Sequence, residues 1–197
     1  MLTASTPPRA QHGIVLFITL IVLVAMTLAG IALVRSVSTT NLIAGNLAFQ
    51  QGAVFAGDTG IENAIAWLDQ NNTGTTLHAD NSGTGYSASR QDPTSGQSWD
   101  DFWNNQLAAQ AFPATPVADA AGNSVQYVIQ RLCASAGDPS AVGVNCATSP
   151  STDASAGSSR SAGGPSYSRS SSVYYRITSR IAGPRNTVSY VQAIVSL

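Results

Sequence analysis

Residues able to do chemistry are few in this 197-residue chain, and they do not cluster in the sequence. Its only histidines are His12 and His78, and Glu62 is its only glutamate. Asp100 and Asp101 are adjacent, so on a helix their carboxylates point to different sides. The sequence contains no nucleophile elbow, phosphate-binding loop or His-Glu-x-x-His motif. Because the set of roles that catalysis needs is absent, we expect a non-enzymatic protein without a cofactor.

Two cysteines, Cys133 and Cys146, offer one covalent possibility. In an oxidising compartment we expect them to form a disulfide that closes a short loop, which would stabilise the fold by roughly 3 kcal/mol. The alternative is a pair of buried free thiols, since unpaired cysteine is often buried.

A second possibility is a metal loop. Asp69, Asn71, Thr73 and Asp80 take the first, third, fifth and twelfth positions of a calcium-loop pattern, and Gly74 takes the sixth. Thr73 and Asp80 are weaker ligands than that pattern requires, and no helix clearly follows. A polar loop at the end of a helix gives the same pattern, so we predict no metal site and keep calcium as the alternative.

The strongest element is an apolar run from Ile14 to Val34, which lies between His12 and Arg35 and contains no ionisable side chain. A helix of this length covers roughly 30 Å, the thickness of a bilayer's hydrocarbon core. A secretory signal is shorter and ends in a cleavage site of small residues, and a core helix has a polar face. We therefore predict a retained membrane helix over 14–34.

Flanking residues give the orientation. The short leader, 1–13, carries Arg9 and His12, which favours a cytoplasmic N-terminus, although Arg35 on the far side weakens the bias. The two cysteines and the Ser/Gly-rich C-terminal half favour an exported domain. The expected topology is a single pass with the N-terminus inside.

We expect the helix to continue beyond the membrane as an amphipathic extension over 35–72, closed by Asn71 to Gly74. Its stripe of apolar residues has seven-residue spacing, and consists of Leu33, Leu47, Val54, Ile61 and Leu68 with Ile43 and Ile65 beside it. Glycines in the same segment cost up to about 1 kcal/mol each relative to Ala. A break at Gly57 to Gly60 is the alternative.

Residues 73–197 have room for one modest soluble domain. We expect a loop over 75–97 and a short helix over 98–107 whose aromatic residues belong to the core rather than to a ligand platform. Three period-2 runs predict strands, the last two forming a hairpin: Ser124 to Leu132, Val173 to Ile181, and Thr187 to Val195. The middle strand should have one buried and one wet face.

Composition limits the partners of this domain. Residues 148–172 are rich in Ser and Gly, so we expect a flexible segment there. Charged residues make up only 10% of the chain and the net charge is −1, which excludes a nucleic-acid-binding surface. The predicted fold is α+β: a long N-terminal helix packed on a small antiparallel sheet.

Several segments together resemble the PilX-type minor pilins of type IV pili. They are the leader ending in Gly13, the uncharged helix from Ile14, the extension containing Ile43-Ala44-Gly45-Asn46 and Ala48-Phe49-Gln50, and the closing Tyr175-Arg176-Ile177-Thr178-Ser179-Arg180 with Val191-Gln192. Ile18 stands where major pilins have a Glu. His12 and Ile14 replace the basic residue and the Phe that commonly flank the cut in pilins.

The resemblance implies a pilin-like fold and cleavage by a prepilin peptidase between Gly13 and Ile14. It implies a minor pilin that primes pilus assembly with other minor pilins and the major pilin, held first in the inner membrane with a periplasmic domain and then in the pilus at the cell surface. The alternatives are a component similar to the K-type pseudopilins of type II secretion, or a membrane-anchored ligand-binding protein that enters no filament.

Overall fold

The computed structural model describes residues 13–150 and 171–197. Most of the predicted leader and of the predicted flexible segment at 148–172 therefore lies outside the described residues. The chain divides into two compact units, the first ending at Ala48 and the second running from Phe49 to Leu197.

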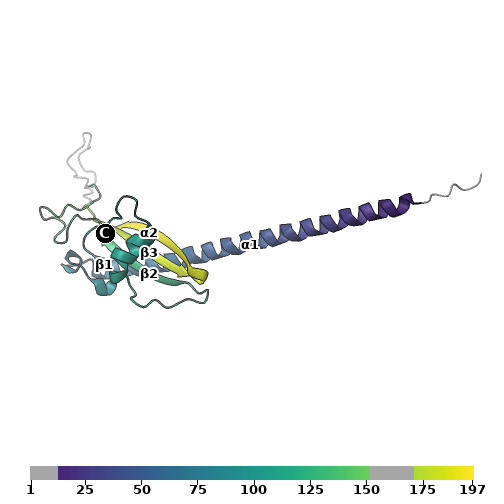
Figure 1. The fold of residues 1–197 in the computed structure, drawn as a ribbon. Helices are drawn as coiled ribbons and strands as arrows, with labels where there is room; N and C mark the ends of the chain where they lie inside the picture. The colour runs from purple at the N-terminus through teal and green to yellow at the C-terminus, as the bar shows by residue number, and fades with distance from the viewer. Residues whose placement is uncertain (1–12, 151–170) are drawn as a thin grey trace, which may run out of the picture. The chain divides into compact units, whose positions relative to one another are not determined.

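Helix α1 runs without interruption from Ile14 to Asn71 (Figure 1). It ends where the sequence predicted, and Gly74 just beyond it has the left-handed φ of +71°. The alternative of a break at Gly57 to Gly60 is wrong, because both glycines are helical and buried.

A four-stranded sheet with the order β1-β2-β3-β4 forms the centre of the second unit. The three predicted strands are confirmed to within two residues as β2 (Ser124–Arg131), β3 (Tyr174–Gly183) and β4 (Thr187–Ser196), all paired antiparallel. The expectation of loop throughout 75–97 is wrong at β1 (Tyr86–Ser87), which pairs parallel with β2. The sheet is therefore mixed, and the α+β class is confirmed.

One face of the sheet is covered by the last turns of α1. Ala64 and Leu68 pack in one cluster with Tyr127, Ile129 and Ile177. Ala53 and Ala56 pack in a second cluster with Ile181. The predicted stripe is only partly correct, because Leu68 is buried whereas Val54 is 50% exposed.

The other face of the sheet is covered as well. A short segment made of α2 (Trp99–Phe102), a π-helical turn (Trp103–Leu107) and a 3-10 turn (Ala108–Gln110) lays a second core against it. Phe102, Trp103 and Leu107 are buried there with Val128, so the predicted aromatic core is confirmed for these residues. It is wrong for Trp99, which is 39% exposed. The expected wet face of β3 is wrong, since Thr178 on that face is also buried.

Candidate functional site

The N-terminal part of α1 exposes a continuous apolar surface. From Ile14 to Ala44 every side chain is exposed, and those of 14–34 are all apolar except Thr19 and Thr27. The most apolar stretch has a mean hydropathy of 2.9, and α1 is long and apolar enough to cross a membrane. Exposure of such a large apolar surface to water is unfavourable, so lipid or another protein must cover it.

The two polar side chains within 14–34 satisfy their own hydrogen bonds. The hydroxyl of Thr19 donates to the carbonyl oxygen of Leu16 at 2.9 Å, and that of Thr27 donates to the carbonyl oxygen of Val24 at 2.8 Å. Neither hydroxyl needs water as a partner. The helix surface therefore suits an apolar environment on all sides.

The candidate processing bond lies at the beginning of this helix. Ile14 is the first helical residue, and Gly13 before it has a φ of +96°, a left-handed conformation that favours glycine. A Cβ on Gly13 would meet nothing within 4 Å. Ile18, four residues into the helix, is 53% exposed on the same surface.

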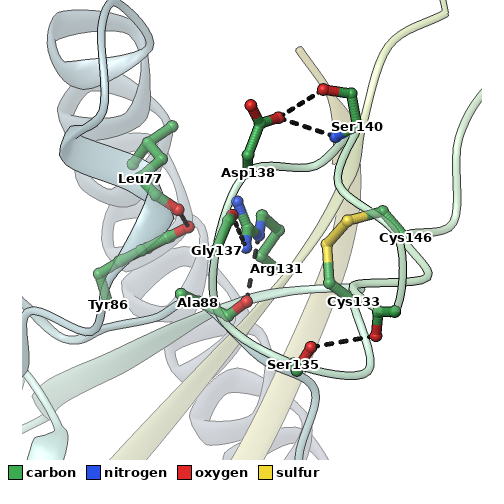
Figure 2. The surroundings of a disulfide bond; sticks show 11 residues. Leu77, Tyr86, Ala88, Arg131, Cys133, Ser135, Gly137, Asp138, Ser140 and Cys146 are labelled. Atoms are coloured by element: carbon green, nitrogen blue, oxygen red, sulfur yellow. Dashed lines mark hydrogen bonds between the residues drawn. A yellow bond between two sulfur atoms is a disulfide. The ribbon is translucent and has the colours of Figure 1, made fainter.

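A disulfide joins Cys133 and Cys146, as expected for an oxidising compartment (Figure 2). Hydrogen bonds inside the loop support it: the N–H of Ala134 donates to the carbonyl oxygen of Val144 at 2.9 Å, and the hydroxyl of Ser135 to that of Gly143 at 3.2 Å. The alternative of two free thiols is excluded, because the described residues contain no unpaired cysteine.

Arg131 connects this loop to the sheet and was not singled out from the sequence. Its guanidinium is fully buried, and donates to the carbonyl oxygens of Ala88 at 3.1 Å and Gly137 at 2.8 Å (Figure 2). It has no carboxylate partner within the described residues. A buried cation is costly unless its donors are paired, and these two hydrogen bonds fix both the arginine and the loop. The remaining guanidinium nitrogen, Nη1, is buried without a partner among the described residues. The only signal for this role in the sequence is an arginine two residues before a cysteine.

Carboxylates near the loop serve local structure. The hydroxyl and the N–H of Ser140 donate to Asp138 at 2.6 and 2.8 Å, and these hydrogen bonds lower the pKa of the Asp138 carboxyl. Asp80, the proposed last ligand of the calcium loop, accepts from the N–H of Ala88 at 2.7 Å. The amide of Asn71 donates to the carbonyl oxygen of Trp67 at 2.8 Å. Two of the four side chains of the calcium-loop pattern, Asp80 and Asn71, therefore have protein partners.

The other candidate residues are also dispersed. Asp100 accepts from the Tyr190 hydroxyl at 2.7 Å, and Asp101 accepts from the Ser98 hydroxyl at 2.7 Å. Glu62 is exposed on α1, and His12 lies outside the described residues. Across residues 13–150 and 171–197, no three His, Cys, Asp or Glu side chains are grouped so that they could hold a metal ion.

No protein-family model, curated protein or solved structure matches this chain. The assignment of a function therefore depends on its own residues and their arrangement.

Proposed function

We propose that the chain is a minor pilin that helps prime the assembly of a type IV pilus and is incorporated into it, without catalysing a reaction. The observation that carries the proposal is the apolar helix after Gly13, which is exposed from Ile14 to Ala44 and continues as α1 into a small sheet domain. Its resemblance to the PilX-type minor pilins supports the same assignment.

A subunit that is stored in a membrane and then moved into a filament needs a helix that is stable in both environments. Lipid covers the surface before assembly, and neighbouring helices cover it afterwards. Ala25, Ala29 and Gly30 are small residues that let helix backbones approach closely. Because the hydroxyls of Thr19 and Thr27 donate within the helix, burial in lipid or among other helices leaves neither donor unpaired.

The proposed partners follow from this role. Prepilin peptidase cuts between Gly13 and Ile14 at the cytoplasmic face of the inner membrane. Other minor pilins and the major pilin then pack against the helix. Ile18, where major pilins have a Glu, supports a minor component. The disulfide between Cys133 and Cys146 supports a periplasmic domain, because the periplasm is oxidising.

Mass spectrometry of the N-terminus of the chain purified from its own cells tests the proposal. We expect a mature protein that begins with N-methylated Ile14. Gly13→Val should block cleavage and leave Met1 in place, whereas Ala10→Val, the same type of change three residues earlier, should be processed normally.

An intact Met1 in a strain with working pili would overturn the assignment and favour the anchored ligand-binding protein. A processed chain that is missing from sheared pili, in a strain that needs it for protein secretion, would favour the pseudopilin alternative. Recovery of the processed chain in sheared pili would support the minor pilin.

A further inference from the structure

The outer strand of the sheet is β4, the last in the order β1-β2-β3-β4. β4 pairs with β3 along its whole length, from Ser196 opposite Tyr174 to Thr187 opposite Gly183. Within the part of the chain that the structure describes, no segment pairs with its other edge. A ten-residue strand with unpaired backbone groups is a template for another strand.

The devices that usually protect such an edge are absent from β4. The strand contains no proline and no Asp, Glu, Lys, Arg or His. Its pairing with β3 is one residue to one residue throughout, so no bulge twists the edge away. Two of its side chains, Val188 and Ile194, are 37% and 65% exposed.

The hydrogen-bond pattern shows which residues of β4 direct their backbone N–H and C=O groups away from β3. The N–H and C=O of Leu197 both bond to Val173, at 3.1 and 2.9 Å. Since bonded and non-bonded pairs alternate in an antiparallel ladder, the odd-numbered residues of β4 bond to β3. The backbone groups of the even-numbered residues, among them Val188, Tyr190, Gln192 and Ile194, therefore face outward.

We propose that β4 pairs antiparallel with β4 of a second copy of this chain, about a two-fold axis that passes beside Val191. In this register Val188 of each copy lies opposite Ile194 of the other, and Tyr190 lies opposite Gln192. All four are even-numbered, so the facing residues exchange hydrogen bonds. The exposed side chains of Val188 and Ile194 therefore cover each other across the interface.

A second copy fits this edge because the segment is complementary to itself. A two-fold interface requires that one strand supply both halves of each pair, and β4 does so in the register centred on Val191. A slip by one residue would place outward-facing groups opposite residues with none to offer. No like charges meet, because 186–197 contain no charged residue. The pairing is independent of the pilin assignment.

Cysteine cross-linking of the full chain in detergent micelles, with copper phenanthroline as the oxidant, tests the register. In the two-fold pair the Cβ atoms at position 191 would lie about 4.5–5.5 Å apart, close to disulfide distance. Val191→Cys should therefore give at least about ten-fold more cross-linked dimer than the control Ser196→Cys, whose copies would lie roughly 33 Å apart.

A second arm uses exposed positions, so that it does not depend on Val191, which packs near α1. A mixture of Val188→Cys and Ile194→Cys chains should cross-link, whereas neither variant alone should. Equal dimer from Val191→Cys and Ser196→Cys would overturn the antiparallel register. No dimer in either arm, with the near-ultraviolet spectrum of the fold unchanged, or cross-linking only to a different protein, would overturn the second copy as the occupant.

Discussion

At the level of single residues, Gly57 and Gly60 set how closely α1 approaches the sheet. A Cβ on Gly60 would lie 2.7 Å from both Ser179 Oγ and Val125 Cγ1, and a Cβ on Gly57 would lie 2.9 Å from Val191 Cγ2. The same glycines lower helix propensity by about 1 kcal/mol each. Close packing against the sheet offsets this cost and explains why the helix does not break there.

Gly60→Ala should destabilise the second unit. The added methyl group must displace Val125, a stiff β-branched side chain, and overpacking of this kind costs about 1–3 kcal/mol, more than Ala gains in helix propensity. We expect a lower midpoint of urea unfolding, followed by tryptophan fluorescence of the full chain in detergent.

Gly52→Ala is the matched control in the same helix. A Cβ there would lie 3.8 Å from Asn123 Nδ2, an ordinary contact. The change should stabilise the unit by up to about 1 kcal/mol through helix propensity. Equal stabilisation by both substitutions would show that the sheet does not constrain α1 at Gly60.

Tyr190 makes stability depend on alkaline pH. Burial and the hydrogen bond to Asp100 raise the pKa of its hydroxyl from 10.0 to about 12. Above pH 10 the unfolded state releases the Tyr190 proton, whereas the folded state still holds it. The contribution of Tyr190 to the free energy of unfolding is therefore complete below pH 10 and is lost as the pH rises toward 12. Tyr190→Phe should therefore show a shallower fall in the urea midpoint between pH 9 and 11 than the parent. An identical fall would contradict this role.

Among the structural elements, the disulfide-bonded loop is held by both a covalent bridge and polar contacts. The bridge spans a sequence separation of 13, and the Arg131 guanidinium fixes Gly137 within it. The double variant Cys133→Ala/Cys146→Ala should lose roughly 3 kcal/mol of unfolding free energy, because the unfolded chain is no longer constrained.

Reduction separates the bridge from the side chains in this test. The reduced parent should unfold at nearly the same urea concentration as the double variant, since both lack the cross-link. A parent that is equally stable with and without reductant would show that hydrogen bonds alone hold the loop.

The regular elements were predictable because their signals are local. Alternating residues placed β2, β3 and β4 to within two residues, and Asn71 marked the end of α1. The predictions that were wrong concern features that depend on contacts between segments distant in the sequence. The two residues of β1 carry no periodic pattern, and Val128 is covered by the Trp103 segment only in three dimensions.

The candidate site was predictable to a similar degree. The apolar run and the two cysteines are explicit in the sequence, so the exposed helix and the disulfide were expected. The buried face of α1 was harder, because small residues such as Ala53 and Gly60, rather than the larger Val54, contact the sheet. Hydrophobicity patterns rank residues by size and polarity, and therefore miss close packing of small residues.

At the level of the whole molecule, the apolar residues of the two units are shielded from water in different ways. The second unit buries its apolar residues within itself, on both faces of the sheet. The first unit buries almost none, since every residue of 14–44 is exposed. Substitutions in the first unit can therefore test whether α1 inserts into a membrane, without changing the core of the second unit.

The double substitution Leu23→Arg/Val24→Arg should abolish stable membrane insertion. The fourteen Ile, Val, Leu and Phe residues from Ile14 to Val34 favour insertion by roughly 0.3–0.6 kcal/mol each, whereas each central arginine opposes it by about 3 kcal/mol. Two arginines therefore cancel nearly all of the free energy that favours membrane insertion. The measurement is the fraction of the chain that stays in the membrane after carbonate extraction.

Leu42→Arg/Ile43→Arg is the control, because it makes the same change at two adjacent positions of α1 that are at least as exposed and lie outside the predicted span. Leu42 and Ile43 are 70% and 63% exposed, against 65% and 46% for Leu23 and Val24. The control should remain in the membrane fraction, since its arginines would lie beyond the hydrocarbon core. Loss of both variants from the membrane would place the span further along α1, and retention of both would contradict a membrane helix at 14–34.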